Sequence, residues 1–344
     1  MRTVYTDSHR LQHGHAELND GQLVPCFEKP ERADLVLARV RRVGLGAVLE
    51  PEDFGRAPLA RVHAGRYLDF LETAWDAWVA EHGPHDALPL NWAVRGMRSD
   101  IEPAHIDGRL SYYSFDAGTP LTAGTWQAVT GSANVALTGQ RLVAGGERAA
   151  FALCRPPGHH AAADYYGGYC FLNNAAIAAQ AFRDQGAARV ALLDIDYHHG
   201  NGGQTIFYHR DDVLFLSIHA DPRWEFPYFL GHADEHGAGP GEGCNVNYPL
   251  PWGTDYAGWA AALDRACRRI ADYAPDALVV SLGVDTFKDD PISRFRLDQD
   301  AYPRIGERLA RLRLPTLFVM EGGYAVEAIG VNAVNVLVGF EEQG

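Results

Sequence analysis

Residues 189–202 begin as an apolar run, and two carboxylates, two imidazoles and two glycines then follow within nine residues. The apolar run is typical of a buried parallel strand. Asp194, Asp196 and His198 alternate, so they point to one face while the chain stays extended. Carboxylates and an imidazole at a strand end are suitable ligands for a divalent metal ion. A strand ending in a polar loop would explain one such residue, but packing gives no reason to gather them all, so the cluster favours a metal site.

The elements that must position this cluster alternate between strand and helix from residue 148 onward. Expected strands cover 149–153, 190–194, 213–218, 277–282 and 315–320, and expected helices cover 174–185, 254–273 and 299–312. Helices are also expected at 30–43, 63–82 and 122–142. The alternation predicts a single doubly wound α/β domain, with a central, mostly parallel sheet flanked by helices.

Polar or glycine-rich turns follow four of these strands. In doubly wound sheets, ligands bind outside the carboxyl ends of the strands, so we expect the four turns to share one edge. The residues concerned are His159 and His160, Asp196 and His198, Asp285, and Gly322 to Tyr324.

Asp196, His198 and Asp285 together would make a site with one histidine and two carboxylates. Three protein ligands leave room for water and a substrate carbonyl, as in catalytic zinc sites. The same ligand set accepts Fe(II) or Co(II), so the sequence leaves the metal open. For Asp285 by itself, a solvated residue capping a strand is an equal alternative.

Three further side chains suit acid–base chemistry at that edge. His159 and His160 follow a stiff Pro-Pro-Gly turn and titrate near neutral pH. Beside a metal-bound water they suit general base and general acid roles. Tyr324 could donate a hydrogen bond to the oxyanion of a tetrahedral intermediate. Taken singly, a pair of loop histidines and a surface tyrosine would be the simpler explanations.

Composition narrows the function classes. The chain has 344 residues, a formal charge of −14 and five scattered cysteines. The charge argues against broad contact with nucleic acid or an anionic membrane, and it fits either a small cationic substrate or ordinary acidity. There is no run of 18 apolar residues and no apolar leader, and the cysteines suit a reducing compartment. We therefore expect a cytoplasmic protein.

Five ordered motifs resemble the zinc-dependent histone deacetylase family, and more closely its bacterial acetylpolyamine amidohydrolase branch. They are RPPGHH at 155–160, GGYCFLN at 167–173, DIDYHHGNG at 194–202, SLGVD at 281–285 and EGGY at 321–324. The resemblance spans nearly the whole chain. It implies the arginase/deacetylase fold and hydrolysis of an acetyl amide to acetate and a free amine. An arginase-like dinuclear site is disfavoured, because the extra carboxylates for a second metal are absent.

The resemblance also implies residue roles. Asp196, His198 and Asp285 match the zinc ligands, His160 the general base and acid, and His159 the neighbouring electrostatic histidine. Tyr324 matches the tyrosine that polarises the carbonyl, Gly168 the glycine whose carbonyl accepts the amide N–H, and Tyr169 and Phe226 the walls of the acyl tunnel. One structural potassium site would involve Asp194, Asp196, His198, Ser217 and Ile218, and a second would use the carbonyl of Phe207.

Two residues depart from the histone deacetylase pattern. Asn201 stands where these enzymes carry an aspartate behind the second tandem histidine, so His160 should be less basic. The polyamine branch is similar in this respect. Glu321 stands where many of them have glycine, which places an acid close to the site. His199, although conspicuous, is expected to be structural.

Residues 84–116 form the least regular segment, which we interpret as an insertion in the single domain 1–344. In the polyamine branch such an insertion builds a homodimer and narrows the entrance. Apolar surface for this contact would come from Trp92, Ile101, Ile106, Tyr112 and Tyr113.

The tunnel aromatics favour a narrow aliphatic chain ending in an acetamide, which describes both acetylputrescine and acetyl-lysine. Glu17 and Asp116 could bind a distal ammonium, or they could be solvated loop acids. We therefore expect an acetylpolyamine deacetylase, with a protein acyl-lysine deacetylase as the alternative. A metal-dependent sensor without activity is a third hypothesis, which the intact His159, His160 and Tyr324 argue against.

Overall fold

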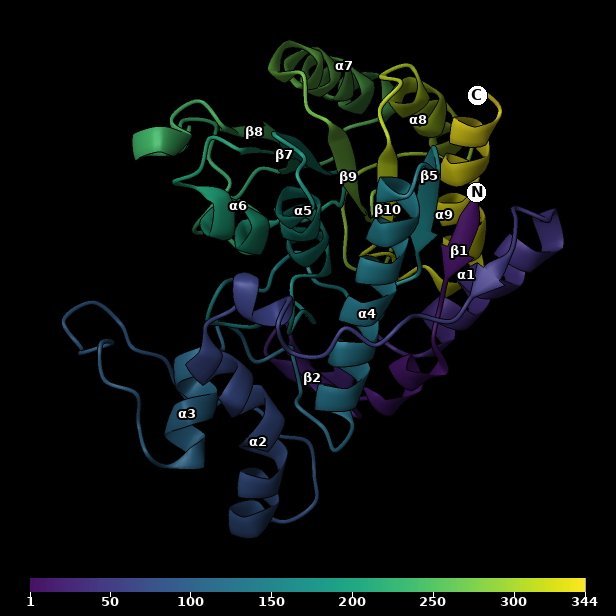
Figure 1. The fold of residues 1–344 in the computed structure, drawn as a ribbon. Coiled ribbons are helices and arrows are strands. Elements are labelled where there is room, and N and C mark those ends of the chain that lie inside the picture. Colours follow the sequence, from purple (N-terminus) through teal and green to yellow (C-terminus); the bar gives the residue numbers. More distant parts are fainter. Residues whose placement is uncertain (344) are drawn as a thin grey trace.

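An eight-stranded parallel sheet forms the centre of the computed structural model, which describes residues 1–343 (Figure 1). Its strand order is β4-β1-β5-β10-β9-β6-β7-β8. The strands are β1 (Arg2–Val4), β4 (Val48–Leu49), β5 (Ala149–Ala152), β6 (Val190–Asp194), β7 (Val213–Ala220), β8 (Asn245–Leu250), β9 (Ala277–Leu282) and β10 (Thr316–Met320). This is the expected doubly wound α/β fold.

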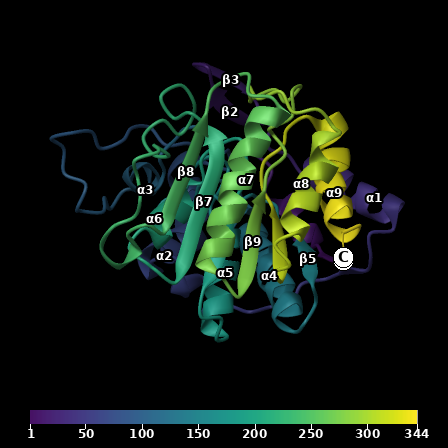
Figure 2. The same ribbon diagram turned by 90° about the horizontal axis from the view of Figure 1, so that it is seen from above.

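Helices cover both faces of the sheet because its strands are apolar on both sides. One face packs against α1 (Glu31–Val43), α7 (Tyr256–Tyr273), α8 (Ala301–Ala310) and α9 (Val326–Glu341). The other packs against α4 (Thr125–Ala144) and α5 (Asn174–Asp184), and α2 (Gly65–His82) and α3 (Ile106–Tyr113) extend the same core beyond the sheet. Figure 2 shows α7 and α8 running along the sheet. Neighbouring residues of one strand alternate between the two cores; Phe151 packs on one side and Ala152 on the other.

The structure contains elements that the sequence did not predict. Residues 8–30, for which no strand or helix was expected, contain the antiparallel hairpin of β2 (Ala16–Asn19) and β3 (Gln22–Pro25). Asp20 and Gly21 form its turn with positive φ angles, and Asp-Gly is a hairpin signal that could have been recognised. The short helix α6 (Asn201–Phe207) was also missed, because two glycines weaken its helical pattern.

The segment 84–116 is mostly irregular, as expected, but it ends in α3. Figure 1 shows its loop projecting from the body of the molecule beside α2 and α3. Ile106 and Tyr113 are buried in the chain's own core, so they cannot supply the exposed dimer surface expected of them. Among residues 1–343, no helix is long and apolar enough to cross a membrane.

Candidate active site

The four polar or glycine-rich turns predicted from the sequence follow strands that are neighbours in the sheet, in the order β5, β10, β9 and β6. In the register of the sheet, Asp194 at the end of β6 lies opposite Ser281 of β9, and Met320 of β10 lies opposite Leu282. Residues far apart in the sequence therefore meet at one edge. This arrangement follows from parallel pairing alone.

Asp196, His198 and Asp285 form a compact buried group, called the metal-fitting group below. Its ligand atoms all lie within 4.8 Å of one another. His198 Nδ1 lies 3.0 Å from Asp285 Oδ2 and 3.4 Å from Asp196 Oδ1. Burial, together with the charge of Asp196, raises the pKa of Asp285 to about 8. Two carboxylates and an imidazole brought so close without solvent fit a bound divalent cation, which would balance their charge.

Backbone donors hold the two carboxylates of this group in place. The N–H of Tyr197 donates to Asp285 Oδ1 at 2.8 Å, and the N–H of Gly322 donates to Asp196 Oδ2 at 2.9 Å. Because Gly322 follows β10, three strand ends contribute to the orientation of the group. Carboxylates fixed by surrounding hydrogen bonds are typical of pre-organised metal sites.

The tandem histidines differ in their partners. His159 Nδ1 lies 2.9 Å from the carboxylate of Asp194, and His160 Nδ1 lies 2.6 Å from the side-chain oxygen of Asn201. Burial would lower the pKa of His159, but the charges of Asp196 and Asp194 raise it to about 10. Burial and the neighbouring imidazoles lower the pKa of His160 well below its usual range. The pair therefore combines a cationic imidazole with a neutral one, as suits a base beside an electrostatic partner.

Tyr324 reaches the same edge from the glycine-rich turn after β10. Its backbone N–H donates to Asp290 Oδ2 at 2.7 Å, and its ring lies 4.6 Å from the guanidinium of Arg32. Burial raises the pKa of its phenol well above 10, so the hydroxyl stays protonated and can donate a hydrogen bond.

A cavity of about 560 Å³ opens onto His160, His198 and Tyr324. Tyr169 and Phe226 line it, and Phe226 stacks on Phe115 with ring centroids 5.6 Å apart. The sequence reasoning missed Phe115, which supports one wall from the end of the 84–116 segment. The aromatic walls suit an aliphatic chain.

Gly168 lies against His160 and has a φ of +54°, which favours glycine. A Cβ at this position would collide with the His160 ring. The glycine therefore lets the backbone approach the imidazole closely.

The chain matches the histone deacetylase domain over residues 26–339. It is 65% identical over 341 residues to acetylpolyamine amidohydrolase 2 of Pseudomonas aeruginosa, covering 99% of both chains. It is 48% identical to the acetylpolyamine amidohydrolase of Mycoplana ramosa, over 98% of this chain and 99% of that one. The crystal structure of acetylpolyamine aminohydrolase from Burkholderia pseudomallei superposes with a TM-score of 0.95 at 43% identity, over 100% and 99% of the two chains.

The chain belongs to the histone deacetylase domain family.

Acidic side chains line the cavity of this histone deacetylase family member. Glu17 is buried, accepts the Tyr169 hydroxyl at 2.7 Å and the Phe27 N–H at 3.2 Å, and has its pKa raised to about 7 by burial. Asp116 accepts the N–H groups of Gly168 and Gly118, so its carboxylate is engaged in holding the chain around Gly168.

Two acids of the cavity, Asp20 and Glu225, were not predicted. Asp20 belongs to the turn of the unpredicted hairpin. Glu225 accepts the Tyr197 hydroxyl at 2.5 Å. It directly precedes Phe226 in the sequence, and this adjacency to a predicted wall residue is the signal by which it could have been found. Arg294 is the single basic side chain, other than histidine, among the described residues that line the cavity, so its lining is acidic overall.

The residues expected around potassium are buried, and Ser217 of β7 lies opposite Asp194 of β6 in the register of the sheet. Ser217 Oγ lies 2.8 Å from His219 Nδ1, and the carbonyl of Phe207 accepts the N–H of Arg210 at 2.9 Å. Ile218, between Ser217 and His219, is fully buried in β7. His219 was not predicted, although its spacing of two from Ser217 places both on one face of the strand.

His199 lies outside the metal-fitting group. Its Nε2 lies 3.1 Å from Gln204 Oε1, and its ring lies 4.5 Å from that of His219. These contacts agree with the structural role expected for His199.

Proposed function

We propose that this amide hydrolase of the histone deacetylase domain family removes acetyl groups from N-acetylated polyamines such as acetylputrescine and acetylcadaverine. The products would be acetate and the free amine. The full-length identity to acetylpolyamine amidohydrolases carries this proposal. The acidic lining of the cavity supports it, since the distal ammonium of a polyamine is cationic and an acetyl-lysine side chain has no such group.

In this proposal Asp196, His198 and Asp285 would hold a zinc ion, with Fe(II) or Co(II) as alternatives that suit the same donors. The ion would supply Lewis-acid polarisation of the scissile carbonyl.

His160 has one nitrogen committed to Asn201, so Nε2 is the nitrogen that takes the proton of the attacking water. The same atom later returns a proton to the leaving amine. His159, held by Asp194, remains charged beside it and stabilises negative charge in the transition state. Tyr324 donates its phenolic hydrogen to the developing oxyanion. The carbonyl of Gly168 would accept the amide N–H, while Tyr169 and Phe226 align the aliphatic chain.

Glu17 is the acid proposed to attract the distal ammonium. Asp116 is proposed to contribute its charge from the position in which it binds the Gly168 N–H. We also propose potassium beside Asp194 and Ser217, with a second ion at the Phe207 carbonyl, and a cytoplasmic location, which the five unpaired cysteines support.

A homodimer formed through the 84–116 insertion completes the proposal. Four apolar side chains of this segment are largely exposed and fit a partner surface. They are Leu90 (80% exposed), Val94 (65%), Met97 (56%) and Ile101 (58%). Size-exclusion chromatography with light scattering should find a dimer for the wild type and a monomer for the Leu90→Ser/Ile101→Ser double variant. A wild-type monomer at micromolar concentration would refute the dimer.

The central test is a comparison of steady-state rates of the zinc-loaded enzyme. The substrates are acetylputrescine, acetylcadaverine, acetylspermidine and an acetyl-lysine peptide. We expect the highest kcat/KM on one of the acetylpolyamines. A peptide rate equal to or above all three would replace the proposed substrate with acyl-lysine, and tight binding without acetate release would indicate a sensor.

A further inference from the structure

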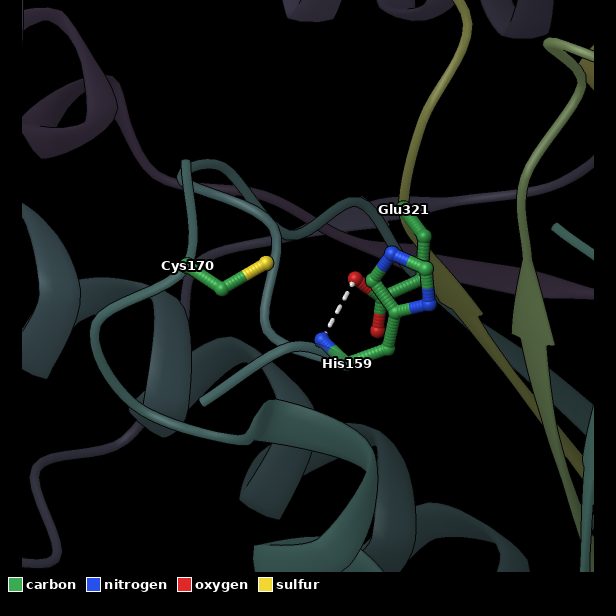
Figure 3. A group of neighbouring side chains, drawn as sticks. All are labelled: His159, Cys170 and Glu321. Atoms are coloured by element: carbon green, nitrogen blue, oxygen red, sulfur yellow. Dashed lines mark hydrogen bonds between the residues drawn. The ribbon is translucent and has the colours of Figure 1, made fainter. Parts of the chain in front are cut away.

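Glu321 is a buried acid at the end of β10 for which the mechanism above has no use. Its side chain is 0% exposed. Its Oε2 accepts the backbone N–H of Gly158 at 2.6 Å and that of His159 at 3.1 Å, while Oε1 has no hydrogen-bond partner among residues 1–343. Figure 3 shows the carboxylate beside the main-chain nitrogen of His159, with the thiol of Cys170 pointing toward it. A buried acid with one free oxygen is costly, so a compensating role is expected.

The three side chains in Figure 3 are close enough to hold a metal ion, but His159 Nδ1 and the Cys170 thiol already have hydrogen-bond partners. His159 Nδ1 is hydrogen-bonded to Asp194. The Cys170 thiol donates to the carbonyl of Gly168 at 3.2 Å, and burial raises the pKa of this thiol well above its usual range. A protonated thiol is a poor metal ligand, so hydrogen bonding is the better explanation of the group.

A second set of hydrogen bonds holds the backbone around Glu321. Arg32, which is buried in α1, donates to the carbonyl of Glu321 and to that of Gly323, each at 2.6 Å. Gly322 donates to Asp196 Oδ2. The segment that carries the Glu321 side chain is therefore fixed relative to the metal-fitting group.

The turn that carries His159 and His160 follows β5, the strand next to β10 in the sheet, and has little regular structure. Its contacts include the bond from the Gly202 N–H to the carbonyl of His159 at 3.1 Å. The carboxylate of Glu321 adds two more bonds, which link this turn directly to the end of β10. Through these bonds, the Glu321 side chain connects the backbone of this turn to the strand end whose Gly322 N–H binds Asp196.

We infer that Glu321 is a positioning residue, which holds the His159–His160 turn against the metal-fitting group by accepting its two backbone N–H groups. This inference rests on the proposed function only in taking His160 as the group that moves the proton. Glutamine preserves the acceptor oxygen and alanine removes it, so the two substitutions separate acceptor geometry from side-chain loss.

The first test measures geometry without activity. Amide hydrogen exchange, followed by mass spectrometry on peptides covering residues 155–162, should be faster in Glu321→Ala than in the wild type and near wild type in Glu321→Gln. Unchanged exchange in Glu321→Ala would overturn the inference. The matched control is Glu235→Gln, because Glu235 also accepts a loop N–H, that of Gly231 at 2.8 Å, but lies away from the cavity lining.

The second test measures kcat and KM with both acetylputrescine and an acetyl-lysine peptide. Glu321→Ala should lower kcat on the order of tenfold or more, because small displacements of a catalytic group are costly. KM should change by less than about twofold, since Glu321 is not among the cavity-lining residues. Glu321→Gln should retain kcat within about threefold.

Three outcomes would overturn the inference: wild-type kcat in Glu321→Ala, an equal loss in both variants, or loss of bound zinc in Glu321→Ala alone. If the wild type hydrolyses only the peptide, the proposed substrate fails, yet the ratio of variant to wild-type kcat still tests Glu321.

Discussion

The side-chain oxygen of Asn201 lies 2.6 Å from Nδ1 of His160. An amide in this position orients the imidazole and fixes its tautomer, but it adds no charge. The neighbouring His159 faces the carboxylate of Asp194 instead. The two imidazoles thus receive different charges from their surroundings although they are adjacent in the sequence, and this difference sets the pH at which His160 can act as a base.

Asn201→Asp should raise the pKa of His160, because a carboxylate stabilises the imidazolium. His160 must be neutral to accept a proton, so activity is lost as the pH falls through its pKa. The acidic limb of the kcat/KM profile should therefore move to higher pH, by about one unit or more. A profile that does not move would contradict the role of His160, and Gln127→Glu, at an exposed position of α4, controls for added charge.

Tyr324→Phe should lower kcat on the order of a hundredfold, the usual cost of losing one oxyanion donor. The ring and its contact with Arg32 remain, so zinc content and melting temperature should stay close to wild type. Metal analysis and thermal unfolding check the two expectations. Near-wild-type turnover would remove Tyr324 from the mechanism.

Gly168→Ala should reduce kcat on the order of a hundredfold, because the new methyl group would displace the His160 ring. Gly186→Ala separates this collision from backbone strain. Gly186 also has a positive φ, of +100°, but a Cβ there would have no atom within 4 Å. The control should lose about 1 kcal/mol of folding free energy and keep its activity. Equal kcat values in the two variants would contradict the collision.

The KM for acetylputrescine should depend on Glu17. Burial raises its pKa to about 7, so the carboxyl is neutral below this pH and negative above it. KM should therefore fall about two- to fivefold from about pH 6 to about pH 8, as the negative charge attracts the ammonium. Glu17→Gln should flatten this dependence. N-butylacetamide, which lacks the ammonium, should show a flat KM with both enzymes; a slope for this neutral amide would assign the effect to another group.

Removal of the divalent metal by a chelator should abolish activity, and added Zn²⁺ should restore it. The ion would bind the folded state through Asp196, His198 and Asp285, so thermal unfolding should move to higher temperature with zinc. Asp285→Asn should weaken both effects. Full turnover with less than about one zinc, iron or cobalt ion per hundred chains would contradict the metal-dependent mechanism.

The sequence was sufficient for five strands of the parallel sheet, because these strands are apolar and alternate with helices. They are β5, β6, β7, β9 and β10. The sequence also placed His159, His160, Asp196 and Tyr324 at one edge, since parallel strands align their carboxyl ends. The pattern of an apolar strand followed by a polar turn predicts where such residues lie. The roles of most of them came from the resemblance between motifs rather than from periodicity.

Long-range side-chain contacts could not be predicted in the same way. Phe115 behind Phe226 and the engagement of Asp116 with Gly168 both depend on how loops fold back over the sheet. Ile106 was interpreted as exposed because its segment is irregular, yet α3 turns it into the core. A loop has no helical or strand periodicity, so the local sequence does not indicate which of its residues face the core and which face solvent.

The position of β10 in the sheet has a consequence for the synthesis of the protein. β10 is the last strand made among the described residues, yet it lies between β5 and β9 in the middle of the sheet. A nascent chain that has not yet released residues 316–324 from the ribosome leaves these two strands without their shared neighbour, and it lacks Tyr324 and the donor to Asp196. Activity therefore cannot begin before residues 316–324 have left the ribosome. A truncation before residue 316 would remove the middle of the sheet rather than a dispensable tail.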